Sequence, residues 1–176
     1  IGYIHKEAEE ILFQLAKQHD RAITVLRPAH LMSNQIYTDI RTIKENSTIR
    51  TCGYANTKIT WVDTKDVADC AVTILTEPVE QHDRSVYEIG GHSLTNEERA
   101  QVFSRVLNQS IQFERESFED TYEAMINTGC SHGIAYDAVA QTTLDYDRPT
   151  PFISLIIKRP LRKLDIWLQE NKSAFE

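Results

Sequence analysis

A short apolar run that ends at a proline constrains the fold of this chain more than any other feature. Residues 23–26 are mostly β-branched and show no clean alternation with polar residues, which is typical of a strand buried on both faces of a parallel sheet. Arg27 and Pro28 follow directly, and because proline cannot extend a central strand, we expect the chain to turn there. Ligands of open α/β sheets bind beyond the carboxyl ends of such strands. The sequence therefore places the functional surface at residues 27–34.

A helix is expected before this strand, over residues 6–18. Its apolar positions recur at helical spacing, with charged and amide side chains between them. They form one stripe, which should face the core: Ala8, Ile11, Leu12, Leu15 and Ala16. A helix followed by a buried strand is half of a βαβ unit, so the pattern predicts an α/β fold with a parallel sheet.

Predicted strands and helices alternate along the rest of the chain, after a loop at residues 29–33. Strands are expected at 48–52, 58–61, 85–89 and 111–114, and helices at 37–44, 64–77, 96–107, 118–127, 134–143 and 161–171. Asp63, Thr95 and Ser117 stand where a side chain can cap the next helix. Glu98 completes a capping box with Thr95.

Composition excludes several classes of protein. The chain has 176 residues and a formal net charge of −7, so it lacks the basic footprint of a nucleic-acid-binding protein. No apolar run is long enough to span a bilayer. The cysteines (Cys52, Cys70 and Cys130) are far apart, which favours reduced thiols over disulfides or a zinc site. We therefore expect a cytoplasmic protein without a membrane or direct nucleic-acid partner.

Five stretches, taken in order, carry a resemblance to a known family. They are residues 5–12, 23–28 with Asn34, 61–68, 87–95 and 159–175. Together they resemble the middle and end of NmrA-like proteins, which are atypical short-chain dehydrogenase/reductases that include quinone reductases and redox-sensing regulators. The resemblance covers nearly the whole chain and depends on the ordered set, because no single motif is decisive.

The resemblance implies only part of a dinucleotide-binding fold. That fold needs a glycine-rich turn after its first strand, where backbone approaches the pyrophosphate, and none of the six glycines forms such a motif. The expected fold class is therefore α/β: the C-terminal portion of a Rossmann-like parallel sheet with a small α+β substrate-side region, without the N-terminal Gly-rich βαβ half. Residues 1–90 would supply the distal Rossmann strands and helices, and residues 91–176 the substrate-side region, of one partial domain.

Two explanations of the missing half remain open: a longer protein of which this is the C-terminal part, or a naturally shortened relative. In either case the strand at 23–26 would have an uncovered apolar edge, which promotes pairing or aggregation. We expect the isolated chain to self-associate or to be poorly stable, to bind no dinucleotide and to be inactive. A monodisperse monomer with one sharp melting transition would contradict the first expectation.

The resemblance also implies a set of candidate site residues. His5, Arg27 and Pro28 would contact NAD(P)H, with His5 placed just before the first helix, and Asn34 would face a small-molecule substrate. Other interpretations stay open: a solvated helix start for His5, and for Arg27 an ion pair with a carboxylate of the first helix. For Asn34, helix capping near Tyr37 is the favoured interpretation.

Other motifs carry little chemistry. Tyr54 and Lys58 match the Y-x-x-x-K pair of short-chain dehydrogenases, but that chemistry needs them one helical turn apart, and here they follow a glycine between two predicted strands. The histidines show no H-x-x-x-H spacing, so no metal site is expected. Cys130 and His132 lie in a predicted loop and make a poor nucleophile pair. The catalytic residues thus stay unknown.

Three functional hypotheses follow. In the first, the chain is the substrate-side part of an NAD(P)H-dependent oxidoreductase that acts on a quinone or a similar small carbonyl acceptor. In the second, it belongs to a non-catalytic NAD(P)-sensing or partner-binding regulator. In the third, it is a truncated product that binds no cofactor.

Overall fold

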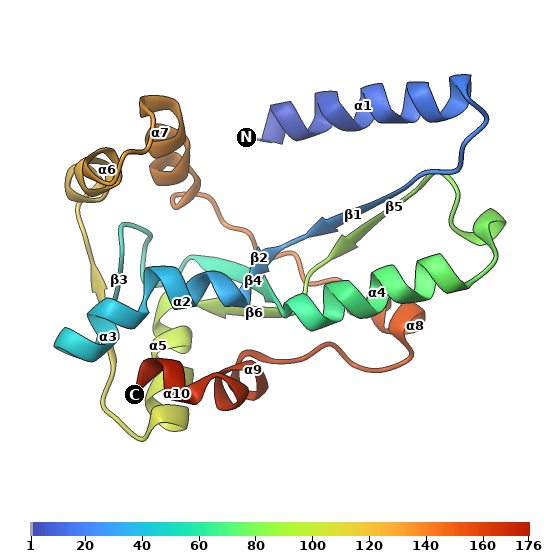
Figure 1. The fold of residues 1–176 in the computed structure, drawn as a ribbon. Coiled ribbons are helices and arrows are strands. Elements are labelled where there is room, and N and C mark those ends of the chain that lie inside the picture. Colours follow the sequence, from blue (N-terminus) through green and yellow to red (C-terminus); the bar gives the residue numbers. More distant parts are fainter. Residues whose placement is uncertain (1) are drawn as a thin grey trace.

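The computed structural model describes residues 2–176, with side chains described from residue 5 onward. The helices are α1 (Gly2–Gln18), α2 (Gln35–Thr38), α3 (Ile40–Asn46), α4 (Thr64–Thr76), α5 (Asn96–Leu107), α6 (Phe118–Asn127), α7 (His132–Gln141), α8 (Ser154–Ile157), α9 (Leu164–Glu170) and α10 (Lys172–Phe175) (Figure 1). The strands are β1 (Thr24–Pro28), β2 (His30–Leu31), β3 (Thr48–Thr51), β4 (Lys58–Val62), β5 (Ser85–Ile89), β6 (His92–Thr95) and β7 (Gln112–Arg115). Three 3₁₀ turns are η1 (Met32–Asn34), η2 (Val79–Gln81) and η3 (Pro151–Ile153).

The predicted α/β class is confirmed. Strand pairs β1–β5, β2–β4 and β3–β7 are parallel, whereas β4 and β6 are antiparallel. The chain passes from one small sheet to the next at two neighbouring points. After β1, which pairs with β5, it enters β2, which pairs with β4; after β5 it enters β6, which also pairs with β4. In the described part of the chain no helix is long and apolar enough to cross a membrane.

The strand expected at residues 23–26 exists, but it is not buried on both faces. It extends through Pro28, which pairs with Ile89, and within residues 2–176 it is seen to pair with β5 alone. Arg27 and Pro28 are exposed and the preceding strand residues are only partly buried. A proline is tolerated here because β1 is an edge strand and Pro28 is its last residue. The predicted turn is absent, and the predicted loop at 29–33 consists of β2 and most of η1.

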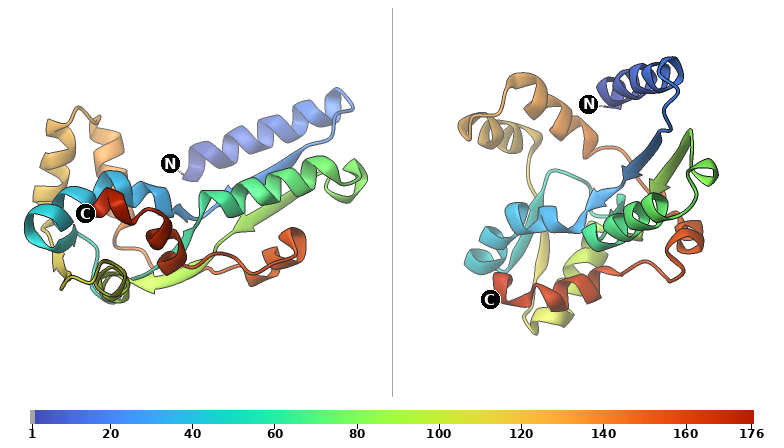
Figure 2. Two further views of the ribbon diagram at one scale, coloured as in Figure 1. Left: turned by 60° about the horizontal axis from the view of Figure 1, so that its bottom comes forward. Right: turned by 45° about the vertical axis from the view of Figure 1, so that its right-hand side comes forward.

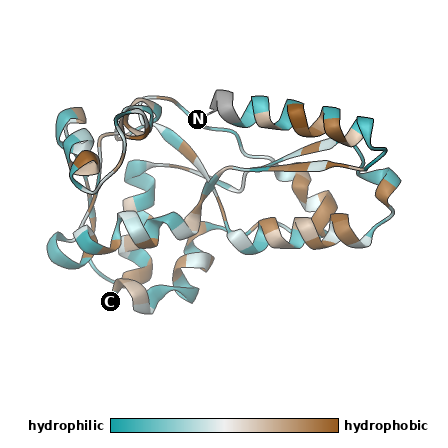
Figure 3. Cartoon of the chain, turned by 45° about the horizontal axis from the view of Figure 1, so that its top comes forward, coloured by the Kyte–Doolittle hydropathy of each residue, from teal (hydrophilic) through white to brown (hydrophobic). Residues whose placement is uncertain are grey.

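Helix α1 also differs from its prediction. It begins at Gly2, so His5 lies inside the helix and not before it. Of the predicted apolar stripe only Ala16 is buried, while Ile11, Leu12 and Leu15 are 52%, 51% and 45% exposed. The apolar positions of α1 are visible in Figure 3, and α1 stands apart from α4 and α8 in the views of Figures 1 and 2. The described elements cover Ala16 at the end of the stripe and leave its other positions exposed.

The other half of the molecule has a closed core. Helix α5 packs against α9 and β7, and α10 contacts α3 and α5. Phe103 is fully buried, with its ring 5.2 Å from that of Phe175 and at 77° to it. The same core contains Trp61, Leu164 and Trp167. Interlocked aromatic and aliphatic side chains of this kind supply most of the stability of a small domain.

Capping explains where several helices begin. Asp63 accepts a hydrogen bond from Lys65 N, Thr95 and Glu98 form the predicted capping box, and Ser117 accepts from Asp120 N. The capping predictions are therefore confirmed. The helix predicted at 37–44 is instead divided at Asp39, whose carboxylate accepts from Arg99 Nη1 at 3.0 Å.

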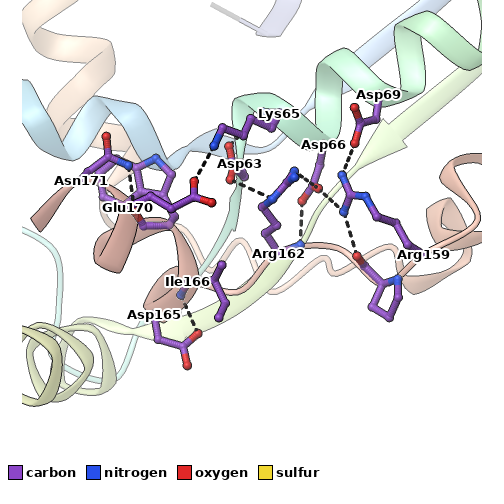
Figure 4. A network of polar contacts seen from close by, with 12 residues as sticks. Asp63, Lys65, Asp66, Asp69, Arg159, Arg162, Asp165, Ile166, Glu170 and Asn171 are labelled. Carbon is purple, nitrogen blue, oxygen red and sulfur yellow. Dashed lines mark hydrogen bonds and ion pairs between the residues drawn. The ribbon is translucent and has the colours of Figure 1, made fainter.

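The predicted C-terminal helix starts three residues later than expected, at Leu164. The reason is an ionic network that holds the preceding residues in an extended segment (Figure 4). Asp66 is completely buried, and it accepts from Arg162 N at 2.8 Å, from Arg162 Nη1 at 3.2 Å and from Arg159 Nη1 at 2.7 Å. Because one α4 carboxylate serves the backbone and two guanidinium groups, it anchors the C-terminal segment to α4.

Candidate functional site

A pocket of about 530 Å³ opens where β1 ends and the strands exchange partners. Its lining comes from α1, β1, β2, η1, β4, β5 and the segment after α7: His5, Arg27, Pro28, Ala29, His30, Asn34, Thr60, Glu88, Ile89, Gly90, Tyr146 and Arg148. The structure thus brings together the four residues that the sequence singled out, His5, Arg27, Pro28 and Asn34. A contiguous hollow of about 720 Å³ shares His5, Arg27, Pro28 and Tyr146 and reaches Gln141 at the end of α7.

Arg27 is committed to ion pairs. Its Nε donates to Glu9 Oε1 at 3.0 Å, its Nη2 donates to Glu9 Oε2, and its Nη1 lies 3.4 Å from Glu88 Oε1. The bond from Arg27 lowers the pKa of the Glu9 carboxyl. Pairing with a carboxylate of the first helix, one of the two open interpretations, is therefore the contact that the structure shows. Arg27 ties α1 to β1 at the mouth of the pocket.

Asn34 does not cap a helix as expected. It occupies the N-cap position of α2 with helical backbone angles, and its side chain makes no capping hydrogen bond. A capping side chain normally requires an extended backbone at this position, which the 3₁₀ turn η1 prevents. Its side chain instead lines the pocket.

His30 is a pocket residue that the sequence did not reveal. Its ring centroid lies 5.6 Å from those of both Trp61 and Tyr146. Burial, and next the positive charge of Arg99, lower the pKa of His30, which favours the neutral imidazole. No local pattern marks His30, since its surroundings come from β4 and from residues 145–151. Only contacts between distant parts of the chain could have found it.

The floor of the pocket is built by close backbone contacts. Thr60 Oγ1 donates to the carbonyl of Tyr146 at 2.7 Å and accepts from Arg148 N at 2.8 Å. A Cβ atom on Gly90 would lie 2.4 Å from the Arg148 carbonyl oxygen, so only glycine allows this approach. The segment at 145–151, predicted as a loop, is thereby held against β4 and β5, with Tyr146 directed to the pocket.

The motifs that the sequence discounted stay outside the pocket. Tyr54 lies in the turn before β4 and Lys58 begins that strand, so they form no helical pair. Ser131 caps α7, and His132 Nδ1 lies 2.9 Å from the hydroxyl of Tyr122. Among the residues that the structure describes, no cluster of three or more acidic, histidine or cysteine side chains could hold a metal ion.

Parallel strand pairs flanked by helices, with a pocket at the strand ends, define an α/β protein of the Rossmann-like class. A model of the NAD dependent epimerase/dehydratase family matches residues 3–90, and the chain belongs to that family. No curated protein sequence matches the chain.

Several solved structures have a similar fold. The NADPH complex of the quinone oxidoreductase QOR2 from Escherichia coli is 19% identical, with a TM-score of 0.76 over 96% of this chain and 58% of that chain. Triphenylmethane reductase from Citrobacter sp., complexed with NADP(H), is 22% identical, with a TM-score of 0.69 over 88% and 54%. NmrA, a negative transcriptional regulator in complex with NAD, is 10% identical, with a TM-score of 0.58 over 85% and 52%. The chain thus spans between 52% and 58% of these proteins, and the NmrA-like resemblance is confirmed for the fold.

Proposed function

We propose that this chain supplies the acceptor side of an NAD(P)H-dependent oxidoreductase that reduces a quinone or a similar small carbonyl compound. The observation that carries the proposal is the convergence of His5, Arg27, Pro28 and Asn34 on one pocket beyond the end of β1. Membership of a NAD dependent family and the fold of two NADPH-linked reductases support it. In this proposal residues 1–90 form the distal Rossmann part and residues 91–176 the substrate-side region.

The residues present fit one end of the cofactor only. The pocket has the volume for a planar ring, and His5, Arg27 and Pro28 at its mouth would hold the nicotinamide end. A pyrophosphate needs glycine backbone free to approach it. Gly90 and Gly91 do not offer that, since Cβ atoms there would lie within 2.8 Å of the carbonyl oxygens of Arg148 and Trp61. We therefore propose that this chain by itself holds no dinucleotide.

The contacts in this site indicate which roles belong to the cofactor and which to the chain's own residues. A bound nicotinamide supplies the hydride. The chain's own residues orient the reactants: Arg27 fixes α1 against β1, and the Thr60 bonds keep Tyr146 beside the pocket. No Tyr–Lys dyad is formed by the described residues, so rate enhancement would come from positioning an acceptor against the cofactor.

The test is NAD(P)H oxidation by the natural full-length protein that contains this chain, with tetramethylbenzoquinone as acceptor. We expect turnover, and we expect Arg27→Lys to lower kcat/KM about tenfold because lysine cannot make the bidentate contact with Glu9. Arg41→Lys is the matched control, since Arg41 pairs with Glu45 on the surface of α3. If the protein binds the dinucleotide but shows no turnover, the hypothesis of a non-catalytic NAD(P)-sensing regulator is favoured. If it shows neither binding nor turnover, only the hypothesis of a truncated product remains.

Self-association is a second proposal, favoured by the free edge of β1 and the exposed stripe of α1. Sedimentation velocity should show oligomers of the 176-residue chain. The double substitution Leu12→Lys with Leu15→Lys should shift them toward monomer. Tyr37→Lys is the control, because Tyr37 is 87% exposed and lies in the packed half. A monomeric wild-type chain would overturn the proposal.

A further inference from the structure

The imidazole of His30 lines the pocket and lies against two aromatic rings. Trp61 and Tyr146 contact its ring, each with centroids 5.6 Å away and planes at 59°. Its backbone is fixed by the β2–β4 ladder, in which His30 pairs with Trp61. Contact with two rings restricts the rotation of the imidazole.

The Trp61 ring also contacts a buried charged side chain. The Arg99 guanidinium lies 5.2 Å from the Trp61 ring, on the side chain that also pairs with Asp39 at 3.0 Å. Arg99 and Asp39 are 4% and 1% exposed. The Trp61 ring therefore lies against the cation of a buried ion pair.

Two other polar side chains of the pocket, Arg27 and Thr60, already have partners. Arg27 is paired with Glu9 and Glu88, and Thr60 Oγ1 is bonded to the Tyr146 carbonyl and the Arg148 amide. In contrast, the nitrogens of His30 make no hydrogen bond to any residue that the structure describes. A neutral imidazole carries one N–H donor, and His30 is held neutral by its surroundings, as its lowered pKa indicates.

We propose that His30 is a substrate-binding residue, whose N–H donates a hydrogen bond to the carbonyl oxygen of an aromatic or quinone acceptor seated in this pocket. The inference rests on the proposed function and goes beyond it, because it names the group that would hold the acceptor. A fixed donor of this kind orients the carbonyl without a charge, and the adjoining Trp61 and Tyr146 rings favour a flat, apolar ligand. The competing interpretation is that His30 has a purely structural role, which requires only its ring and not its N–H.

Two substitutions separate the roles. His30→Phe keeps a ring beside Trp61 and Tyr146 and removes the N–H, whereas His30→Gln loses the ring and keeps an N–H donor. The probe is tetramethylbenzoquinone, whose substituted ring carbons do not add cysteine thiols, and the readout is calorimetric titration of the 176-residue chain without dinucleotide. His132→Phe is the matched control, since His132 is exposed on α7 and does not line the pocket. Circular dichroism confirms that each variant is folded.

We expect the wild-type chain and His132→Phe to bind the quinone alike. His30→Phe should weaken binding about tenfold, as loss of one hydrogen bond does, and His30→Gln should restore part of the affinity. Equal binding by wild type and His30→Phe, or no binding by wild type, overturns the inference. Quinone binding that depends on His30, with no NAD(P)H oxidation by the full-length protein, would instead overturn the proposed function alone.

Discussion

Helices α5 and α1 are both amphipathic, but they differ in how far their apolar side chains are buried. Both helices carry an apolar stripe, yet Phe103 on α5 is fully buried while Leu12 on α1 is 51% exposed. The difference lies in the partners: α5 packs on α9 and β7, whereas the described elements leave Ile11, Leu12 and Leu15 of α1 about half exposed. An amphipathic pattern therefore predicts a helix, but it predicts burial of the apolar side chains only when another element is available to pack against them.

The contact between α1 and β1 is also more exposed than the contacts of the α5 core. Arg27 of β1 forms an ion pair with Glu9 of α1, and the Arg27 side chain is 44% exposed. Exposed pairs contribute about 1 kcal/mol or less. The α1 side of the pocket is thus joined to β1 by a partly exposed ion pair, and segments with few buried contacts are the ones that open locally.

The largest expected effect compares two truncations. Phe103→Ala should reduce the free energy of unfolding by about 3–5 kcal/mol, because it opens a cavity beside Phe175. Leu12→Ala should change it by less than about 0.5 kcal/mol, since its side chain is already half exposed. Urea denaturation measures both. Similar losses would show that the α1 stripe is covered in solution.

The next effect concerns the buried carboxylate that anchors the C-terminal segment. Asp66→Ala should cost about 2–4 kcal/mol, because Arg159 and Arg162 lose their shared partner. Asp69→Ala is the control: its side chain is 47% exposed, so losing its contact with Arg159 should cost less than about 1 kcal/mol. Urea denaturation again provides the values. Equal losses would mean that Asp66 is not the anchor.

The smallest effect is a pH dependence of stability from His30. Its pKa in the folded chain is lowered by burial and Arg99, whereas in the unfolded chain it returns to about 6.5. The unfolded state then binds more protons, so stability should be complete above about pH 7 and fall as the pH drops below the unfolded-state pKa of about 6.5. His92, whose pKa burial also lowers, adds to this slope. His30→Phe should flatten the slope of unfolding free energy against pH; an unchanged slope would contradict the assignment.

Local chemistry was predictable along most of the chain. The caps at Asp63, Thr95 and Ser117 and the strand at 85–89 lie where the sequence placed them, since each depends on neighbouring residues. The four site candidates meet in one pocket because three of them are close in sequence to the end of β1.

What the sequence could not provide depends on distant partners. The burial of β1 and α1 was overestimated because a pattern cannot show whether a neighbour is present. His30 was missed since Trp61 and Tyr146 reach it from 31 and 116 residues further along the chain (61 − 30 and 146 − 30). The start of α9 was misplaced because Asp66 accepts from the backbone N–H of Arg162, which stays outside the helix.

The close approach at Gly90 restricts how natural variation can reshape this protein. Even a methyl group there would displace the Arg148 carbonyl, and with it the segment that carries Tyr146. Relatives that accept larger molecules should therefore differ in the length or composition of residues 145–151, while position 90 stays glycine. Ligand preference in this lineage would then evolve through one surface segment, leaving the strands beneath it unaltered.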